Sequence, residues 1–179
     1  MYCGKNPSAL KSREWIRKAL LELLKERKYV QITIKDICKK ADLSRQTFYK
    51  IYASKDEVME YHFKELFLEF KEQCGDFCGI TVKDIACTFF EFFYNHRVLM
   101  QELFDNNLSY FLEKQFELFL PQIDLFRELS SADPYPEYSI AYVAGALTQV
   151  LIHWFQSDLD LSITEMGIII EHQLPQRYH

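Results

Sequence analysis

The chain has 179 residues, of which 49% are apolar and 16% aromatic, so it can bury a sizeable core and is not a disordered protein. Its net charge of −5 excludes a uniformly basic nucleic-acid-binding protein, but the charge is divided unevenly. Residues 1–56 carry 14 Lys and Arg against 6 Asp and Glu, a balance of +8, whereas residues 57–179 carry 7 against 20, a balance of −13. A basic segment on an acidic body predicts a localised phosphate-binding module.

The five cysteines indicate free thiols in a reducing cytoplasm, because their number is odd and no signal peptide precedes them. Cys74 and Cys78 are four residues apart, but no second pair of Cys or His follows at the spacing of a structural zinc site. We therefore expect no metal and no cofactor. The sequence also lacks a Gly-rich phosphate loop, a nucleophile elbow and a paired-His motif, so it does not predict an enzyme.

Helix signals follow one another along the whole chain, and the predicted fold is all-α. The first helix, at about residues 8–27, places its apolar residues on one stripe, with Lys and Arg elsewhere. Later helix starts are predicted by four pairs of a hydroxyl and an acidic residue three positions apart, which is typical of a capping box. The pairs are Thr33 with Asp36, Ser54 with Glu57, Thr81 with Asp84, and Ser162 with Glu165.

Two short helices, at about residues 34–40 and 45–52, are separated by a tight turn and predict a helix-turn-helix. In such a unit the second helix enters the major groove of DNA, with its first residues facing the base edges. Arg45 and Gln46 occupy those positions. Because Arg can pair with guanine and Gln with adenine, we predict that both residues read bases.

Four further side chains supply donors suited to DNA phosphates, namely Thr47, Tyr49, Lys50 and Lys55. Lys55 also opens the fourth helix, expected at residues 55–74, whose free N–H groups favour an anion. A solvated pair of surface helices is the alternative interpretation. It leaves the balance of +8 in the first 56 residues unexplained.

The run ITIKDICKKADLSRQTFYKIYASKDEV resembles the DNA-binding domain of the TetR (tetracycline-repressor-like) family of bacterial transcription regulators. The resemblance covers about residues 12–61 and includes a threonine opening the second helix, a serine ending the turn and a Thr-Phe-Tyr run in the third helix. It implies DNA-backbone contacts from Thr33, Thr47, Tyr49 and Lys55. Asp42 stands where the family usually has glycine, at a turn position that often needs a positive φ.

The rest of the chain predicts a helical regulatory domain, with the domains at residues 1–56 and 57–179 joined rigidly through the fourth helix. Residues 138–157 carry no full charge, but their polar side chains and the lack of Lys or Arg flanks indicate a buried helix rather than a membrane span. Pro121 is expected to kink or break its helix. The helices are expected at residues 82–95, 97–104, 108–129, 137–157 and 163–173.

The last two helices resemble those that pair two subunits in one branch of the family. Their small and apolar residues predict a homodimer interface, because a helix that is apolar almost all round requires burial on more than one side. The predicted interface residues are Ala141, Gly145, Leu147, Leu151, Trp154 and Ile169.

In the family, the middle helices enclose a cavity for a small inducer, and the resemblance implies such a cavity here. Aromatic stripes at helical spacing usually form core, so core is the alternative for each candidate residue. The candidates are Phe89, Phe93, His96, Met100, Phe104, Tyr142 and His153.

The sequence is therefore interpreted as a homodimeric repressor that an unknown small-molecule inducer releases from a double-stranded DNA operator. By resemblance, the inducer changes the distance between the two recognition helices through the fourth helix. One alternative is a DNA-binding regulator, repressor or activator, that a partner protein controls. Another is a helical bundle that never touches DNA.

Overall fold

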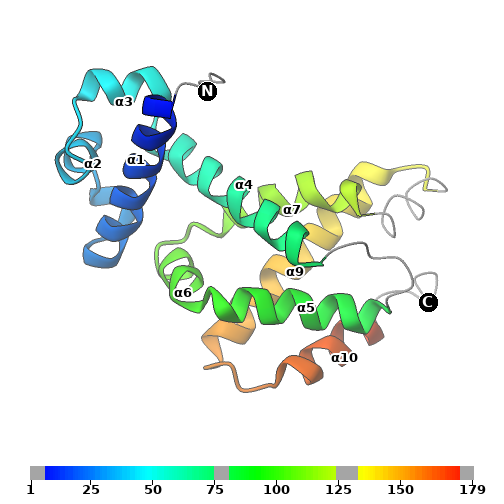
Figure 1. Cartoon of the computed structure of the whole chain (residues 1–179). Coiled ribbons are helices and arrows are strands. Elements are labelled where there is room, and N and C mark those ends of the chain that lie inside the picture. Colours follow the sequence, from blue (N-terminus) through cyan, green and yellow to red (C-terminus); the bar gives the residue numbers. More distant parts are fainter. Residues whose placement is uncertain (1–6, 75–80, 124–132, 174–179) are drawn as a thin grey trace. The chain divides into compact units, whose positions relative to one another are not determined.

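The computed structural model describes residues 7–74, 81–123 and 133–173, and within these ranges every regular element is helical, as predicted (Figure 1). None of the described helices combines the length and the hydrophobicity that a membrane span needs. The chain forms two compact units, residues 1–65 and 66–179. They divide inside α4 (Lys55–Cys74), whose first turn is the predicted domain boundary.

The N-terminal unit packs three helices and the first part of α4 around a small apolar core. The predicted stripe of the first helix is buried, with Ile16 and Leu20 fully covered, and this helix packs on the next two. Ile37 and Phe48 complete the core from the following helices, and neither is exposed. The elements are α1 (Pro7–Glu26), a 3-10 turn (Tyr29–Gln31), α2 (Ile34–Lys40) and α3 (Arg45–Ile51).

The predicted helix starts are present, and three of the four capping boxes form in full. These are Thr33 with Asp36, Thr81 with Asp84, and Ser162 with Glu165. At the start of α4, the Glu57 N–H donates to Ser54 Oγ at 3.1 Å, as predicted. The Glu57 carboxylate, however, accepts from the N–H of Ala53 rather than from that of Ser54.

In the C-terminal unit, Pro121 ends a helix, as expected of a residue that lacks an N–H. The helix predicted at residues 108–129 stops at Phe119, and Pro121 lies in a 3-10 turn, Leu120–Gln122. The last part of that predicted helix lies outside the described residues. The helices of this unit are the end of α4, α5 (Val82–Asn95), α6 (Arg97–Asp105), α7 (Ser109–Phe119), α9 (Pro136–Gln156) and α10 (Ile163–Gln173).

Phenylalanine rings fill the centre of the C-terminal unit. They come from α4, α5 and α7 and meet mostly edge to face, the geometry that aromatic pairs prefer. The centroid of Phe67 lies 5.0 Å from that of Phe116, and the centroid of Phe89 lies 4.9 Å from that of Phe93. Packing of rings on rings, without polar groups, therefore holds α4, α5 and α7 together.

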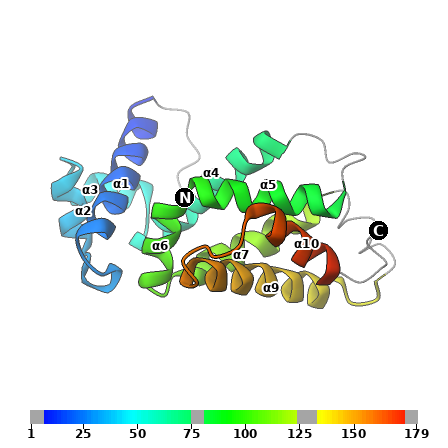
Figure 2. The same cartoon turned by 90° about the horizontal axis from the view of Figure 1, so that it is seen from below.

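The last helix, α10, lies against α5 (Figure 2). Gly167 makes this close approach possible. A Cβ atom at Gly167 would lie 2.5 Å from the Sγ of Cys87 and 3.2 Å from the carbonyl oxygen of Lys83, both on α5. The neighbouring helix α9 packs instead on α7.

Candidate nucleic-acid interface and apolar cavity

The turn between α2 and α3 has the backbone geometry of a helix C-cap. Asp42 adopts a positive φ of 52°, the conformation for which the family usually supplies glycine. The Leu43 N–H donates to the Cys38 carbonyl at 2.9 Å, as in a Schellman motif. Asp tolerates this left-handed conformation better than most residues, so the departure from glycine leaves the turn intact.

Helix α3 presents one polar, exposed face. Ser44 starts the helix by accepting the Thr47 N–H at 3.0 Å, and Phe48 and Ile51 turn inward and are buried. The burial of Ile51 excludes its side chain from the exposed face of the helix. Four predicted DNA-contacting residues lie on the opposite, exposed face, namely Arg45, Gln46, Tyr49 and Lys50.

The cations of this face are not neutralised by acidic side chains of the described ranges. Lys40 of α2, in contrast, pairs with Glu26 at 2.8 Å, whereas no described salt bridge engages Arg45 or Lys50. The Arg45 guanidinium lies 5.9 Å from the ring centroid of Tyr49, one helical turn away. The exposed face of α3 is thus positively charged and rich in hydrogen-bond donors, the properties that DNA phosphates and base edges require.

Two predicted phosphate-binding residues make contacts inside the domain. The hydroxyl of Thr33 caps α2 and donates to the Asp36 carboxylate at 2.6 Å, and this bond holds the pKa of Asp36 below its usual value. The ammonium of Lys55 donates to the carbonyl oxygens of Tyr29 at 2.6 Å and Ile32 at 2.9 Å. Thr33 is nevertheless exposed, whereas Lys55 is half-buried.

A polar contact attaches α1 to the first part of α4. Arg17 Nη1 lies 2.9 Å from Nδ1 of His62, a residue that is only 6% exposed. The same guanidinium binds the Glu14 carboxylate at 2.6 and 2.8 Å, which lowers the pKa of Glu14. Because a guanidinium can only donate, Nδ1 of His62 is the acceptor in this bond.

These features define a helix-turn-helix DNA-binding fold with a separate helical domain. Residues 16–61 match the profile of the bacterial regulatory proteins of the tetR family, which confirms the predicted resemblance. The N-terminal domain of the chain therefore resembles the DNA-binding domain of the tetR family.

Two curated relatives of the chain are described as HTH-type regulators of transcription. The HTH-type dhaKLM operon transcriptional activator DhaS of Lactococcus lactis subsp. lactis (strain IL1403) is 26% identical over 118 residues, which are 65% of this chain and 62% of DhaS. The uncharacterized HTH-type transcriptional regulator YxbF of Bacillus subtilis (strain 168) is 42% identical over 52 residues, which are 28% of this chain and 14% of YxbF. The matched part of the chain thus spans less than two thirds of each relative.

A solved structure shows that the fold extends over both domains. The dihydroxyacetone kinase operon activator DhaS superimposes with a TM-score of 0.57 at 22% identity. The superposition covers 90% of this chain and 92% of DhaS. The C-terminal helical domain therefore shares its fold with this protein.

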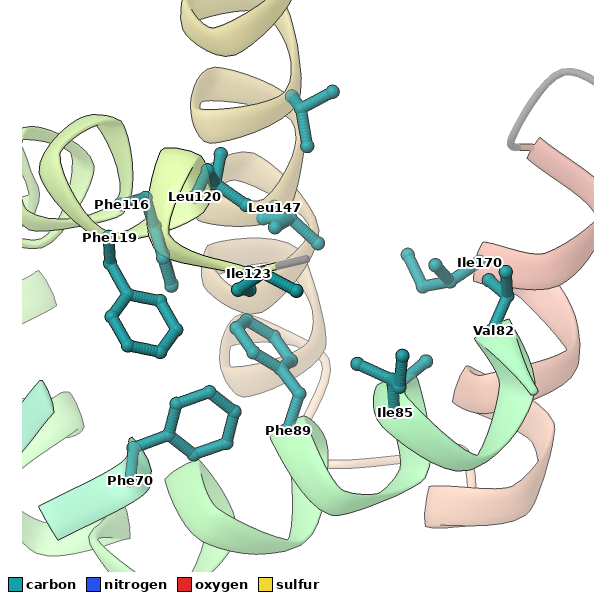
Figure 3. Close-up of a pocket in the computed structure, with 12 residues that line it drawn as sticks. Phe70, Val82, Ile85, Phe89, Phe116, Phe119, Leu120, Ile123, Leu147 and Ile170 are labelled. Carbon is teal, nitrogen blue, oxygen red and sulfur yellow. The ribbon is translucent and has the colours of Figure 1, made fainter. Parts of the chain in front are cut away.

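The C-terminal unit contains an apolar cavity of about 70 Å³ (Figure 3). It lies between α5, α7 and α9, with further walls from α4, α10 and the 3-10 turn after α7, and every lining residue is apolar. Among the described residues, the lining contains no side chain that could recognise a charged or hydrogen-bonding ligand. The lining residues are Phe70, Val82, Ile85, Ala86, Phe89, Phe116, Phe119, Leu120, Ile123, Val143, Leu147 and Ile170.

Of the seven predicted pocket residues, only Phe89 lines this cavity. Phe93 and Met100 are fully buried in the core nearby, and Phe104 packs on Phe155. His96 joins α5 to α6, with Nδ1 2.9 Å from the Phe92 carbonyl oxygen. The remaining two, Tyr142 and His153, are exposed on α9. Sequence analysis missed most of the lining, although Val82, Ile85, Ala86 and Phe89 follow helical spacing along one face of α5.

Five of the six predicted interface residues are on α9, where some are buried and others are exposed, and Ile169 is on α10. Leu151 and Trp154 are buried in the core of the chain itself, and Leu147 lines the apolar cavity. Ala141 is exposed, and Gly145 is half-buried beside Glu113 of α7. A second hollow, of about 380 Å³, lies between α9 and α10, and the predicted interface residue Ile169 lines it together with Trp154 and the exposed His153.

Proposed function

We propose that the chain is a sequence-specific DNA-binding transcriptional regulator that binds its operator as a homodimer. The exposed face of α3 supports this proposal most directly. Arg45 and Gln46 open a recognition helix whose cations no described acidic side chain neutralises, and Tyr49 and Lys50 continue the same face. In this arrangement Arg45 and Gln46 read base edges, while Tyr49 and Lys50 contact phosphates.

The salt dependence of DNA binding tests this function. Six phosphate contacts per dimer give a log–log slope of about −5, at roughly 0.9 per phosphate neutralised. Binding to fragments that flank the gene would be measured by fluorescence anisotropy from low to high salt. Lys50→Ala is expected to flatten the slope, whereas Lys71→Ala, which removes an exposed lysine from the C-terminal unit, leaves it unchanged. A wild-type slope near zero would contradict DNA binding.

The exposed face of α9 supports the homodimer. Tyr138 and Tyr142 are 72% and 75% exposed, and the small residues Ala141 and Ala146 lie exposed beside them. Tyrosines and small residues together suit a close helix–helix interface. One helix-turn-helix reads only a few base pairs, so two copies are needed on a two-fold site, with half-sites about 34–36 Å apart.

Sedimentation at micromolar concentration tests the dimer. Wild-type protein is expected at twice the 21.4 kDa mass of the chain, and Ala141→Arg is expected to dissociate it by placing a charge in the interface. Leu118→Arg is the matched control, because Leu118 is also exposed but belongs to α7. A wild-type protein that sediments as a monomer would contradict both the dimer and its two-fold operator.

Two modes of control are proposed for this regulator. In the first, it is a repressor released by a small inducer in the apolar cavity. In the second, a partner protein controls it, and it activates transcription. The volume of about 70 Å³ argues against this cavity as an inducer site and so favours the second mode, because pockets for drug-sized ligands usually measure about 300–1,000 Å³. The hollow of about 380 Å³ between α9 and α10 is within that range and is the alternative site for an inducer in the first mode. The relative DhaS is itself named an activator.

Filling the cavity separates the two modes. Ala86 is buried and lines the cavity, so Ala86→Leu would occupy its space. Under inducer control, this variant is expected to stay on the operator in cells while the wild-type protein is released. Under control by a partner protein, both respond alike. A reporter fused to the promoter shows whether the protein represses or activates transcription, since deletion of a repressor raises expression and deletion of an activator lowers it.

A further inference from the structure

The ammonium of Lys55 is held by two backbone carbonyl groups, one from the first residue of the 3-10 turn and one from the residue that follows the turn. Nζ lies 2.6 Å from the oxygen of Tyr29 and 2.9 Å from that of Ile32, so two of its three N–H groups have short acceptors within the domain. Ile32 directly precedes Thr33, the residue that caps α2. The first turn of α4 is therefore bonded to the segment that starts the helix-turn-helix.

The side chain of Tyr29 closes this contact from a second direction. Its ring centroid lies 4.2 Å from the Lys55 ammonium, a cation–π distance, and its hydroxyl donates to the Asp56 carboxylate at 2.6 Å. Tyr29 is only 5% exposed. Burial lowers the pKa of Lys55, and the neighbouring Asp56 charge opposes this shift.

The contacts of Lys50 are different. Lys50 lies exposed on α3, and no described salt bridge engages it. Its ammonium can reach a phosphate without breaking a bond within the chain. Lys55 has only its third N–H group left for the same contact, and moving its ammonium towards a phosphate would strain two charge-assisted hydrogen bonds, each stronger than a neutral one.

We propose that Lys55 is a positioning residue and not a phosphate contact. Together with Tyr29 and Asp56 it forms a clamp that fixes the first turn of α4 to the start of α2. This inference rests on the proposed DNA-binding function. Displacement of the first turn of α4 is thereby passed to α2 and, through the turn at Asp42, to the recognition helix.

Labelling of lysine amines tests the clamp without any substitution. With limiting acetic anhydride and mass spectrometry, Lys55 of the free protein is expected to react about tenfold more slowly than Lys50, since its hydrogen bonds must open first. Adding calf-thymus DNA at low salt should then protect Lys50 and leave the rate of Lys55 unchanged. Equal rates in the free protein, or protection of Lys55 by DNA to the extent seen for Lys50, would overturn the proposal.

The same experiment keeps the two proposals apart. If DNA protects no lysine, the DNA-binding function fails, while the rates in the free protein still decide whether Lys55 is held by the carbonyl groups.

Two variants test the positioning role in operator binding. Lys55→Met is expected to lower affinity at every salt concentration and to keep the wild-type slope, whereas Lys50→Met reduces the slope by about 2 per dimer, at roughly 0.9 per lost phosphate contact.

Tyr29→Phe removes the bond to Asp56 and no charge. It keeps the proposal testable if Lys55→Met does not fold, because a positioning role predicts weaker binding with an unchanged slope. Loss of slope in Lys55→Met, or wild-type affinity in Tyr29→Phe, would contradict the clamp.

Discussion

The two units of the chain use aromatic side chains in different ways. In the N-terminal unit, tyrosines meet charged groups: the Tyr29 hydroxyl binds Asp56, and the guanidinium of Arg45 lies over the ring of Tyr49. In the C-terminal unit, phenylalanines of α4, α5 and α7 meet one another, as in the contact between Phe67 and Phe116.

The two kinds of contact constrain different properties of the structure. A hydrogen bond to a charged group fixes the direction of a side chain, and so the orientation of the helix that carries it. Packing of apolar rings fixes volume and is tolerant of how the volume is divided among residues. We therefore expect substitutions in the C-terminal unit to act mainly on stability, and polar substitutions in the N-terminal unit to act mainly on recognition.

The largest effect is expected from truncating a ring in the phenylalanine core. Phe93 is fully buried and contacts the rings of Phe67, Phe89 and Phe116. Phe93→Ala should lower the free energy of unfolding by about 3–5 kcal/mol through lost burial and a new void. Urea unfolding followed by circular dichroism measures this loss. The control is Leu118→Ala at an exposed site, and a loss below about 1 kcal/mol for Phe93→Ala would contradict the tight packing.

A smaller effect is expected where α10 meets α5. Gly167→Ala should destabilise the protein by about 1–3 kcal/mol, because the new methyl group would overlap the Sγ of Cys87. Gly145→Ala is the matched control on α9, where the nearest atom, an oxygen of Glu113, lies at an ordinary 3.6 Å. Adding Cys87→Ala should restore part of the stability lost in Gly167→Ala. Equal melting temperatures for the two single variants would show that α10 does not approach α5 this closely.

Recognition is expected to respond to α3 without a comparable loss of stability. Arg45→Ala should reduce discrimination at one operator position by about 1–3 kcal/mol, the usual contribution of a bidentate Arg–guanine pair. Lys50→Ala should instead weaken binding to all sequences alike. Selection from a randomised duplex pool with each variant measures both effects. A change of preferred base in Lys50→Ala would reverse the assignment of readers and phosphate contacts.

The smallest effect concerns pH and the cap of α2. The hydroxyl and N–H of Thr33 bind the Asp36 carboxylate and lower its pKa from the usual 3.8, so protonation is harder in the folded chain than in the unfolded chain. The charged Asp36 carboxylate thus stabilises the folded chain fully above pH 3.8, and this stabilisation is lost as the pH falls through the lowered pKa of Asp36 in the folded chain. Titration of carboxyl carbons by NMR should show the pKa of Asp36 rising in Thr33→Val. Ser162→Ala, which alters the equivalent cap of α10, should leave Asp36 unchanged.

The sequence predicted the N-terminal domain well because its signals are local. Capping pairs such as Thr33 with Asp36 act across a single helical turn, and the left-handed conformation expected at Asp42 is present. The alternation of inward Phe48 and outward Tyr49 follows from helical periodicity alone.

The same reasoning could not orient α9 or place Lys55. Because α9 is apolar almost all round, its periodicity does not distinguish the face of Tyr142, which is exposed, from that of Trp154, which is buried. The acceptors of Lys55 are the carbonyl groups of Tyr29 and Ile32, more than twenty residues away. Because every residue type has a backbone carbonyl group, the sequence does not indicate which of them accept this bond. The approach of α10 to α5 likewise depends on tertiary packing, with Gly167 its only mark in the sequence.

The bond between Arg17 and His62 assigns the proton of a buried imidazole. Since the guanidinium can only donate, the imidazole must keep a lone pair on Nδ1 and cannot be an imidazolium. A proton taken up there would turn a 2.9 Å attraction into a contact between two cations inside a nearly closed site. The attachment of the first helix to α4 therefore selects one tautomer of His62, with the ring proton on Nε2, so this contact fixes the place of a proton as well as that of a side chain.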